Sequence, residues 1–263
     1  MNPISMLRQV RHEIAEIHAS VHQCGTLQSG ANADRSANRL FIANLYLRGY
    51  GIEVGALHNP LPVPREASVR YVDRMSATDL RQQYPELGKQ RLVEPDVIDD
   101  GEKLATFPDA SVDFIIANHF IEHCGDPIGT LSHFLRVVRR GGVIFLAAPD
   151  KRYTFDRERP LTSLEHLVID HAEGPDQSRR QHFEEFAKAM ESLRNDPVYA
   201  DTINDLCNAD FLERTNYSIH YHVWDHSSFL AFLLSIRERF ELDYDIDFAL
   251  RNGDESIAIL KRL

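Results

Sequence analysis

Histidines occur beside acidic residues in three separate segments of this chain. One reads His119-Phe-Ile-Glu-His123, one runs from Thr162 to His171, and one runs from Tyr217 to His226. An imidazole is a suitable general base near neutral pH, because its ordinary pKa is about 6.5. The candidate bases are His119, His123, His166, His220 and His222, and the sequence does not choose among them.

The first segment also has the spacing H-x-x-E-H, which on a long helix places the two histidines of a zinc peptidase on one face. Here the motif follows an apolar, strand-like run, so a peptidase is disfavoured. The alternative is a divalent ion bound by His119, Glu122, His123 and a more distant histidine. Otherwise Glu122 and His123 anchor the following helix by hydrogen bonds, and our assignment contains no metal.

The third segment alternates polar and aromatic residues. Alternate side chains of an extended strand point to the same side, so His220, His222 and Trp224 are expected to share one face, as the wall of a substrate pocket. Asp225 or Ser227 is expected to be the N-cap of a helix that begins here.

Acidic residues follow two strand-like runs that precede these segments. The first run ends at Glu53-Val-Gly55, where the glycine permits a sharp turn and close approach of a ligand. The second ends at Asp73, near the position, about 20 residues later, where a carboxylate binds a ribose diol. Glu53 could order the loop or hold a ligand's ammonium group through water. The loop is not GxGxxG and is a poor pyrophosphate site.

A charged stretch follows the apolar run 141–149. Loops at the carboxyl edge of a parallel sheet are where substrates bind, so this stretch predicts a polar floor for a substrate. The same charges could instead form a solvated cluster. The predicted substrate-binding residues are Asp150, Arg152, Tyr153, Asp156, Arg159, His166 and Trp224.

The elements that position these residues alternate along the chain. The apolar runs GIEVGA, VRYVDRM, VDFIIAN and GGVIFLAAP alternate with helix candidates at 76–83 and 126–139, which indicates a parallel sheet covered on both faces. Two further runs around Asn252-Gly-Asp254 predict a C-terminal antiparallel hairpin. Amphipathic patterns predict helices over 4–23 and 36–48. We expect an N-terminal helical extension (1–48) and a main domain (49–263) with a helical, His-rich insertion at about 160–238.

The composition of the chain disfavours several classes of protein. The 263 residues carry a formal net charge of -11, which disfavours a nucleic-acid-binding protein. No apolar run approaches the ~20 residues of a membrane span, and the N-terminus lacks the apolar core of a signal peptide. Cys24, Cys124 and Cys207 form no disulfide framework. We expect a cytoplasmic protein with a small-molecule or glycan partner, and a homodimer is left open.

Several ordered motifs within about 48–150 resemble one family. They are the Asp96 to Leu104 stretch, Phe107-Pro-Asp-Ala-Ser-Val-Asp113, Glu122-His123, and Arg136-Val-Val-Arg-Arg-Gly-Gly142. This order is similar to that of class I S-adenosylmethionine-dependent methyltransferases, type 11 branch. The resemblance implies an α/β, Rossmann-like, seven-stranded, mostly parallel sheet with the antiparallel hairpin at its C-terminal end.

The resemblance also implies a cofactor site. Glu53, Gly55 and Ala56 would line the methionine part of S-adenosylmethionine, Asp73 would bind the ribose, and Asp100 and Gly101 would lie beside the adenine. Asn118 and His119 would face the sulfonium. The predicted cofactor site also includes Leu57, Arg74 and Glu102. The chain departs from the family where Leu57 and Asn59 replace glycines and where Arg140 replaces a proline.

For the acceptor we expect a hydroxyl group, on a small molecule or a sugar. The stretch Pro149 to Asp156 resembles proteins associated with glycosyltransferases, which implies O-methylation in surface-polysaccharide assembly. The alternatives are a metal-assisted methyltransferase and a non-catalytic, cofactor-binding module of the same fold. An NAD-dependent oxidoreductase is disfavoured by the missing GxGxxG and by the terminal hairpin.

Overall fold

The computed structural model describes residues 30–87 and 90–263. It divides into two compact units, Met1–Tyr46 and Leu47–Leu263. The described part of the first unit is helix α2 (Gly30–Tyr46), which begins earlier than the predicted helix over 36–48. The helix predicted over 4–23 lies outside the described residues.

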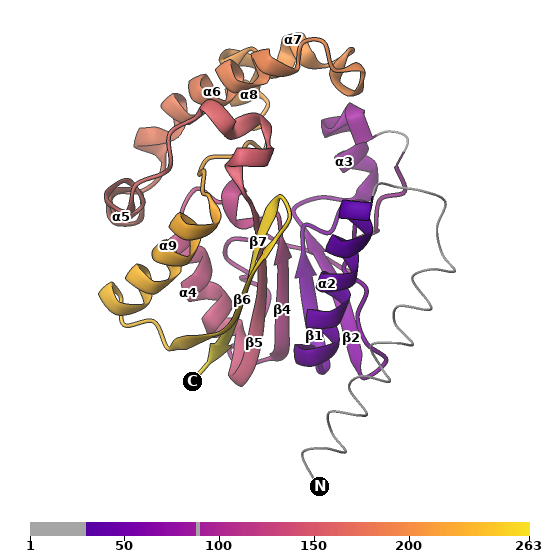
Figure 1. Cartoon of the computed structure of the whole chain (residues 1–263), viewed down its shortest axis with the longest axis vertical. Helices are drawn as coiled ribbons and strands as arrows, with labels where there is room; N and C mark the ends of the chain where they lie inside the picture. The colour runs from indigo at the N-terminus through magenta and orange to yellow at the C-terminus, as the bar shows by residue number, and fades with distance from the viewer. Residues whose placement is uncertain (1–29, 88–89) are drawn as a thin grey trace, which may run out of the picture. The chain divides into compact units, whose positions relative to one another are not determined.

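The second unit is built on a sheet of seven strands, counted over the described residues, in the order β3-β2-β1-β4-β5-β7-β6 (Figure 1). Strands β1 to β5 are parallel, and β7 pairs antiparallel with both β5 and β6. This confirms the predicted fold class. The strands are β1 (Gly49–Val54), β2 (Ala67–Asp73), β3 (Val97–Ile98), β4 (Val112–Asn118), β5 (Val138–Pro149), β6 (Tyr244–Asn252) and β7 (Glu255–Arg262).

The central strands are the apolar runs of the sequence, and nearly all of β4 and of the second half of β5 is buried. The edge strand β6 instead alternates exposed and partly buried residues. Strand β5 has an irregular start, because its register with β4 shifts between Val112 and Phe114. A Cβ on Gly142 would lie 2.5 Å from the Asp113 carbonyl oxygen, so the shift needs glycine at that position.

Helices α4 and α9 pack on one face of the sheet, where Phe134 and Phe232 join the core formed by Ile115 and Ile144. The helices of the second unit are α3 (Ala77–Gln83), α4 (Pro127–Val137), α5 (Leu164–Glu173), α6 (Asp176–Met190), α7 (Ile203–Leu206), α8 (Ala209–Arg214) and α9 (His226–Arg239). Short 3-10 turns are η1 (Pro85–Leu87), η2 (Ile121–His123), η3 (Lys151–Tyr153), η4 (Phe155–Glu158), η5 (Glu191–Leu193) and η6 (Pro197–Tyr199).

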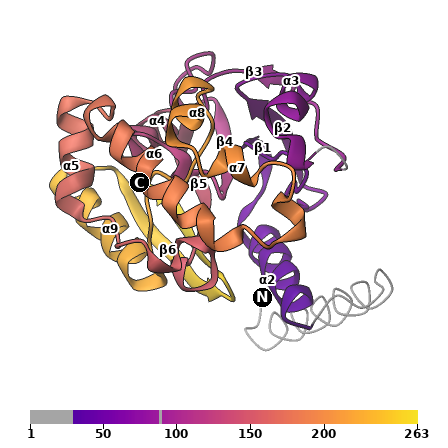
Figure 2. The ribbon, with the colours of Figure 1, turned by 90° about the horizontal axis from the view of Figure 1, so that it is seen from above.

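Helices α6, α7 and α8 lie above the carboxyl ends of the strands (Figures 1 and 2). They have a core of their own, in which Phe183, Leu206 and Leu212 pack together with Leu80 and Tyr84 from the region of α3. The insertion therefore covers the edge of the sheet where ligands of such folds bind. Within the described ranges, no helix has both the length and the apolar character that crossing a bilayer requires.

Asp225 is the N-cap of α9. Its carboxylate accepts the Ser228 N–H at 2.8 Å, and the Ser228 hydroxyl accepts the Asp225 N–H at 2.9 Å, which forms a capping box. Replacing Asp225 with Ala should lower the free energy of unfolding by about 0.5–2 kcal/mol, as measured by urea denaturation. Ser227→Ala, at the neighbouring exposed position, is the matched control and should change it by no more than about 0.5 kcal/mol. Equal losses in both variants would contradict this assignment.

Candidate active site

A cavity of about 380 Å³ lies where the carboxyl ends of β1, β2 and β4 meet the insertion. Its lower half is formed by the strand ends and by the 100–102 turn. Its upper half is formed by residues of the insertion and by Phe155 of η4, most of them aromatic or apolar. The lower lining includes Gly55, Leu57, Asp73, Arg74, Asp100, Gly101, Glu102, His119 and Phe120. The upper lining includes Phe155, Phe186, Met190, Tyr199, Leu206, Tyr217, Ser218 and His220.

The loop after β1 keeps a left-handed backbone without a second glycine. Gly55 has φ +65° and Leu57 has φ +48°, although a leucine rarely adopts this region. The Gly55 N–H donates to the Val72 carbonyl at 2.9 Å, and the Leu57 carbonyl accepts from the Val93 N–H at 2.7 Å. These bonds hold Leu57 in a conformation that a glycine would adopt more readily, so the leucine costs strain.

Glu53 is buried at the end of β1, and its side chain holds this loop in place. Its two carboxylate oxygens lie 3.0 and 3.1 Å from the Leu61 N–H, so one side chain fixes the end of the loop to the end of β1. Glu53 and Ala56 are not part of the cavity lining, whereas Gly55 and Leu57 are. This geometry supports the loop-ordering role among the two considered for Glu53.

Asp73 ends β2 and lines the cavity. One of its oxygens accepts the Arg74 N–H at 2.7 Å. Burial raises the pKa of this carboxyl, partly offset by the hydrogen bond and charge of Arg74. Arg74 also lines the cavity, and its guanidinium donates to the Tyr84 hydroxyl at 2.7 Å.

The turn after β3 brings Asp100, Gly101 and Glu102 to the same cavity. A Cβ on Gly101 would lie 2.5 Å from a Val54 methyl and 2.7 Å from the Phe120 ring, so glycine is required for the ring to pack there. Burial raises the pKa of Glu102, whose carboxylate accepts the Gly125 N–H at 3.1 Å. Asp100 is paired with Lys103 at 3.0 Å.

Asn118 is the last residue of β4, and His119 follows it. His119 has φ +50°, and its Nε2 lies 2.9 Å from the buried Glu255 carboxylate of β7. A non-glycine residue in this region of backbone space is a sign of a constrained site. Asn118 does not line the cavity, and its buried amide has no hydrogen-bond partner among the described residues.

Glu122 and His123 lie on the 3-10 turn η2. Neither carboxylate oxygen of Glu122 has a hydrogen-bond partner among the described residues, and burial raises the pKa of Glu122 to about 7. Burial and the nearby His220 lower the pKa of His123 to about 3, so His123 is neutral at ordinary pH. Its Nδ1 lies 2.8 Å from the Ile219 carbonyl. His123 lines the cavity.

His220 is the histidine that a carboxylate orients. Its Nδ1 lies 2.6 Å from Asp156 Oδ2, and the other oxygen of Asp156 accepts from Arg159 at 2.7 Å. Burial opposes ionisation of Asp156, but the hydrogen bond from His220 and the charge of Arg159 hold its pKa below the usual value. The described residues offer no hydrogen-bond partner to His220 Nε2, and His220 lines the cavity. A carboxylate on one ring nitrogen fixes the tautomer in which the other can accept a proton.

Other predicted substrate residues lie away from the cavity lining. Asp150 is buried, and it pairs with Arg152 and accepts the His226 N–H at 3.4 Å. Tyr153 is 58% exposed, next to the Arg152 guanidinium. Trp224 is buried against Phe232, with ring centroids 5.3 Å apart. Asp156 and Arg159 do not line the cavity, but both hydrogen-bond to His220. This polar stretch therefore positions a residue of the site and does not form the cavity floor.

His166 and His222 are also outside the cavity lining, in a second cluster with Asp170 and His182. His220 and His222 therefore do not share one face. The segment from Tyr217 to Trp224 forms no strand apart from one bridge between Trp224 and Asp150. Its backbone N–H groups at Tyr221 and His222 both reach the Glu122 carbonyl, at 2.8 and 3.2 Å, so the chain turns between the two histidines.

Several lining residues carry no signal in the sequence. Phe120, Tyr84, Phe155, Phe186 and Tyr217 contribute apolar surface, and this chemistry does not distinguish them from core residues. Glu255 pairs with His119 and lies in a mostly apolar strand. A charged residue in such a strand was the signal in the sequence that could have identified it.

The comparisons with known proteins agree with this geometry. Residues 55–146 match the sequence model of a family described as "Methyltransferase domain", of the type 11 branch. No curated protein matched the chain. Residues 55–146 therefore carry a methyltransferase domain, which confirms the resemblance.

Solved structures with a similar fold include three from bacteria. One from Rhodobacter sphaeroides, provisionally described as a zinc-dependent alcohol dehydrogenase, is 14% identical over 95% of this chain and 98% of its own, with a TM-score of 0.51. An Aquifex aeolicus methyltransferase is 12% identical over 94% and 96%, with a TM-score of 0.45. A Thermotoga maritima methyltransferase is 12% identical over 89% and 91%, with a TM-score of 0.45. The Rhodobacter likeness concerns the fold alone.

Proposed function

We propose that this protein binds S-adenosylmethionine in the lower half of the cavity and methylates a hydroxyl of a small molecule or sugar held in the upper half. The observation that supports this most is the single cavity that joins the strand ends to the His220–Asp156 pair. Methyl transfer requires the acceptor atom to be held in line with the methyl group, and a continuous cavity allows this.

The residues of the lower half suit the cofactor. Asp73 presents a carboxylate at the end of β2, where a ribose diol is bound in such folds. Asp100 and Gly101 would lie beside the adenine, and Gly55 would let the methionine part approach the backbone. S-adenosylmethionine supplies an electrophilic methyl group when bound. Among the remaining predicted cofactor residues, Glu53 acts through the loop that it orders.

His220 is the proposed general base. With Nδ1 hydrogen-bonded to Asp156, its Nε2 would accept the proton of an acceptor hydroxyl during methyl transfer, in which the sulfur–methyl bond of the cofactor would break as the oxygen–methyl bond forms. Asp156 and Arg159 are positioning residues, because they hold the ring and its peptide: Arg159 also donates to the His220 carbonyl at 2.8 Å. The neutral His123 packs against His220 at 4.8 Å between ring centroids and limits rotation of the ring.

The upper half suits an acceptor with both hydroxyls and an apolar face, as a sugar ring has. Phe155 lies 4.8 Å from the His220 ring, and Tyr199 and Tyr217 complete an aromatic wall. Binding sites for small molecules commonly combine such apolar walls with a few placed polar groups. A second hollow of about 500 Å³ shares Leu206 and Tyr217 with the cavity, so the acceptor could extend beyond one ring.

Two experiments test this proposal. Calorimetry should detect binding of S-adenosylmethionine, and a thermal-shift screen should show stabilisation by this cofactor and none by NAD, because only a ligand of the folded state raises the melting temperature. Mass spectrometry should then find added methyl groups on members of a panel of mono- and oligosaccharides. No cofactor binding at millimolar concentration would rule out the enzyme, and binding without transfer to any hydroxyl compound would favour a non-catalytic module.

A second candidate is metal-assisted methyl transfer. Three possible ligand atoms lie within 4.8 Å of one another, one each from Glu122, His123 and His220. The Glu122 carboxylate has no hydrogen-bond partner among the described residues. A catalytic ion there would need this carboxylate as a ligand. Glu122→Gln should then abolish the metal dependence of the activity together with the activity itself, whereas full activity in this variant would exclude the candidate.

We further propose a reducing compartment such as the cytoplasm, because both described cysteines, Cys124 and Cys207, are free thiols.

A further inference from the structure

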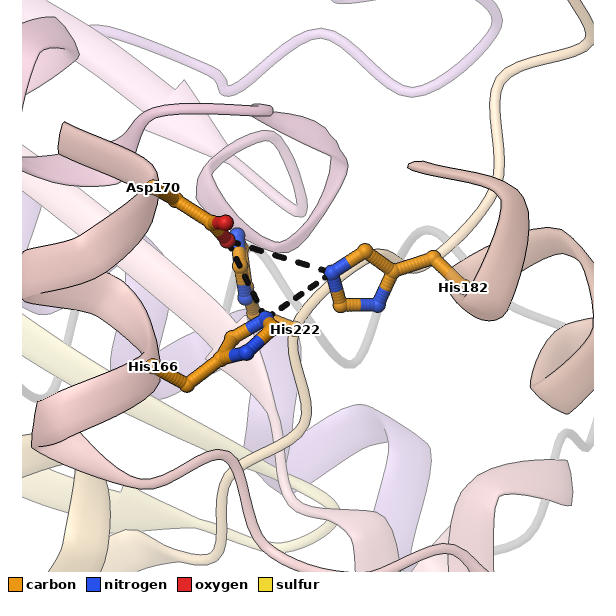
Figure 3. A group of neighbouring side chains, drawn as sticks. All are labelled: His166, Asp170, His182 and His222. Carbon is orange, nitrogen blue, oxygen red and sulfur yellow. Dashed lines mark hydrogen bonds and ion pairs between the residues drawn. The ribbon is translucent and has the colours of Figure 1, made fainter. Parts of the chain in front are cut away.

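A second cluster of histidines lies in the insertion, apart from the cavity. His166 and Asp170 are one turn apart on α5, His182 faces them from α6, and His222 comes from the segment before α9 (Figure 3). The four residues each present one nitrogen or oxygen atom, and these atoms lie within 4.8 Å of one another. None of them lines the cavity of the proposed methyl transfer.

The distances resemble those between the ligands of one ion. His166 Nε2 lies 3.0 Å from His182 Nε2 and 3.1 Å from Asp170 Oδ2, and His182 Nε2 lies 3.9 Å from Asp170 Oδ2. Tetrahedral zinc with Zn–N distances of about 2.0–2.1 Å separates neighbouring ligand atoms by roughly 3.3–3.4 Å. The three measured separations lie on both sides of this value, so small side-chain movements would complete the geometry.

Hydrogen bonds satisfy only part of the cluster. Asp170, His182 and His222 are buried, yet Asp170 Oδ2 and the Nδ1 atoms of His182 and His222 have no hydrogen-bond partner among the described residues. Buried polar atoms without partners are costly and therefore rare in folded proteins. A cation bound to Asp170 Oδ2 and to His222 Nδ1 would give a partner to two of these three atoms.

We propose that His166, Asp170, His182 and His222 bind one divalent transition-metal ion, Zn²⁺, at a site that fixes the helical insertion. Three imidazoles and one carboxylate are ligands that Zn²⁺ accepts, and four protein ligands are the usual number for a structural zinc site. His222 would bind through Nδ1, since its Nε2 faces the Gly125 carbonyl at 3.5 Å.

The surroundings orient one of these ligands. The Ser178 hydroxyl donates to the other oxygen of Asp170 at 2.7 Å, which orients the carboxylate. Hydrogen bonds of this kind are usual behind metal ligands.

An ion can reach the site from the surface. The His166 side chain is 29% exposed, and a hollow of about 170 Å³ beside it is lined by His166, His182 and Glu185. The ion would link α5 and α6, which follow one another in the sequence, to the 217–225 segment, which is distant from them in sequence. Its role is therefore structural, with no open position left for a substrate.

The test is metal analysis of the untagged full chain by inductively coupled plasma mass spectrometry. We expect about one Zn²⁺ per chain, lost in His182→Ala and in Asp170→Asn. Ser178→Ala, which removes the hydrogen bonds of this hydroxyl to Asp170 and to the Pro175 carbonyl, should weaken Zn²⁺ binding about 10–100-fold. His133→Ala, which changes a histidine outside both clusters, is the matched control and should keep the ion.

A titration of the metal-stripped wild-type chain, in competition with a chromophoric chelator, keeps the test independent of how the variants fold. Failure to bind Zn²⁺ in this titration would overturn the proposal, as would equal binding by a folded His182→Ala variant. Iron or manganese in place of zinc, lost in the same variants, would overturn the choice of ion. Because metal content is measured without methyl transfer, the result does not depend on the proposed function.

Discussion

A His220→Ala variant is expected to lose methyl transfer by about 10²–10⁴-fold in kcat, the range that loss of a general base usually produces. Among the histidines that line the cavity, His220 is the one whose Nδ1 is held by a carboxylate of Asp156, at 2.6 Å, so its Nε2 is the proposed acceptor of the proton. Binding of S-adenosylmethionine should change little, since the cofactor residues are in the other half of the cavity. The measurements are kcat with a saturating acceptor and the cofactor Kd by calorimetry.

Two further variants show whether a loss of kcat in His220→Ala comes from the proposed base. Asp156→Asn should reduce kcat without changing the cofactor Kd, because Asp156 acts only through the orientation of His220. His133→Ala, outside the cavity lining, should leave both quantities unchanged. If folded His220→Ala keeps kcat within about threefold of wild type, the base is another histidine or the reaction needs none.

The second large effect concerns the cofactor. Asp73→Ala should weaken S-adenosylmethionine binding by about 100-fold or more, because hydrogen bonds to a charged group are worth about 1.5–3 kcal/mol each and a ribose diol can donate two. The fold should remain intact, since the known partner of this carboxylate is the adjacent Arg74 N–H. Calorimetry measures the loss, and thermal unfolding checks the fold.

Acidification provides an independent check of Asp73. Because burial raises its pKa, the carboxylate gains a proton at a higher pH than an exposed aspartate would, and cofactor affinity should fall there. In Asp73→Ala this part of the pH dependence should disappear. Asp109→Ala is the control for an acidic residue, since Asp109 is 78% exposed and should affect neither affinity nor its pH profile. Unchanged affinity in Asp73→Ala would show that the ribose is bound elsewhere.

The strands were predictable because burial on both faces leaves a long apolar run. The run 112–118 is the whole of β4, and the turn at Asn252-Gly-Asp254 separates the two strands of the hairpin. Strand β3 was not predicted, since Val97–Ile98 is too short for any periodic pattern. The order of the strands depends on contacts between distant residues, which local patterns do not contain.

The candidate site was predictable where chemistry and strand ends coincide, as at Gly55, Asp73 and Gly101, all of which line the cavity. It was less predictable in the insertion. The spacing of His220 and His222 predicted that both side chains lie on one face of a strand. The backbone between them is irregular, and their rings lie in different clusters. His182 was not singled out, because a lone histidine on an amphipathic helix gives no sign of its partners.

The carbonyl of Glu122 accepts the N–H groups of both Tyr221 and His222, so one short peptide carries the proposed base at one end and a proposed metal ligand at the other. Thermodynamic linkage then has a specific consequence. If Zn²⁺ and the acceptor both favour the ordered form of this peptide, each must raise the affinity for the other by the same factor. The apparent affinity for the acceptor would thus depend on the concentration of zinc, although none of the proposed zinc ligands lines the cavity.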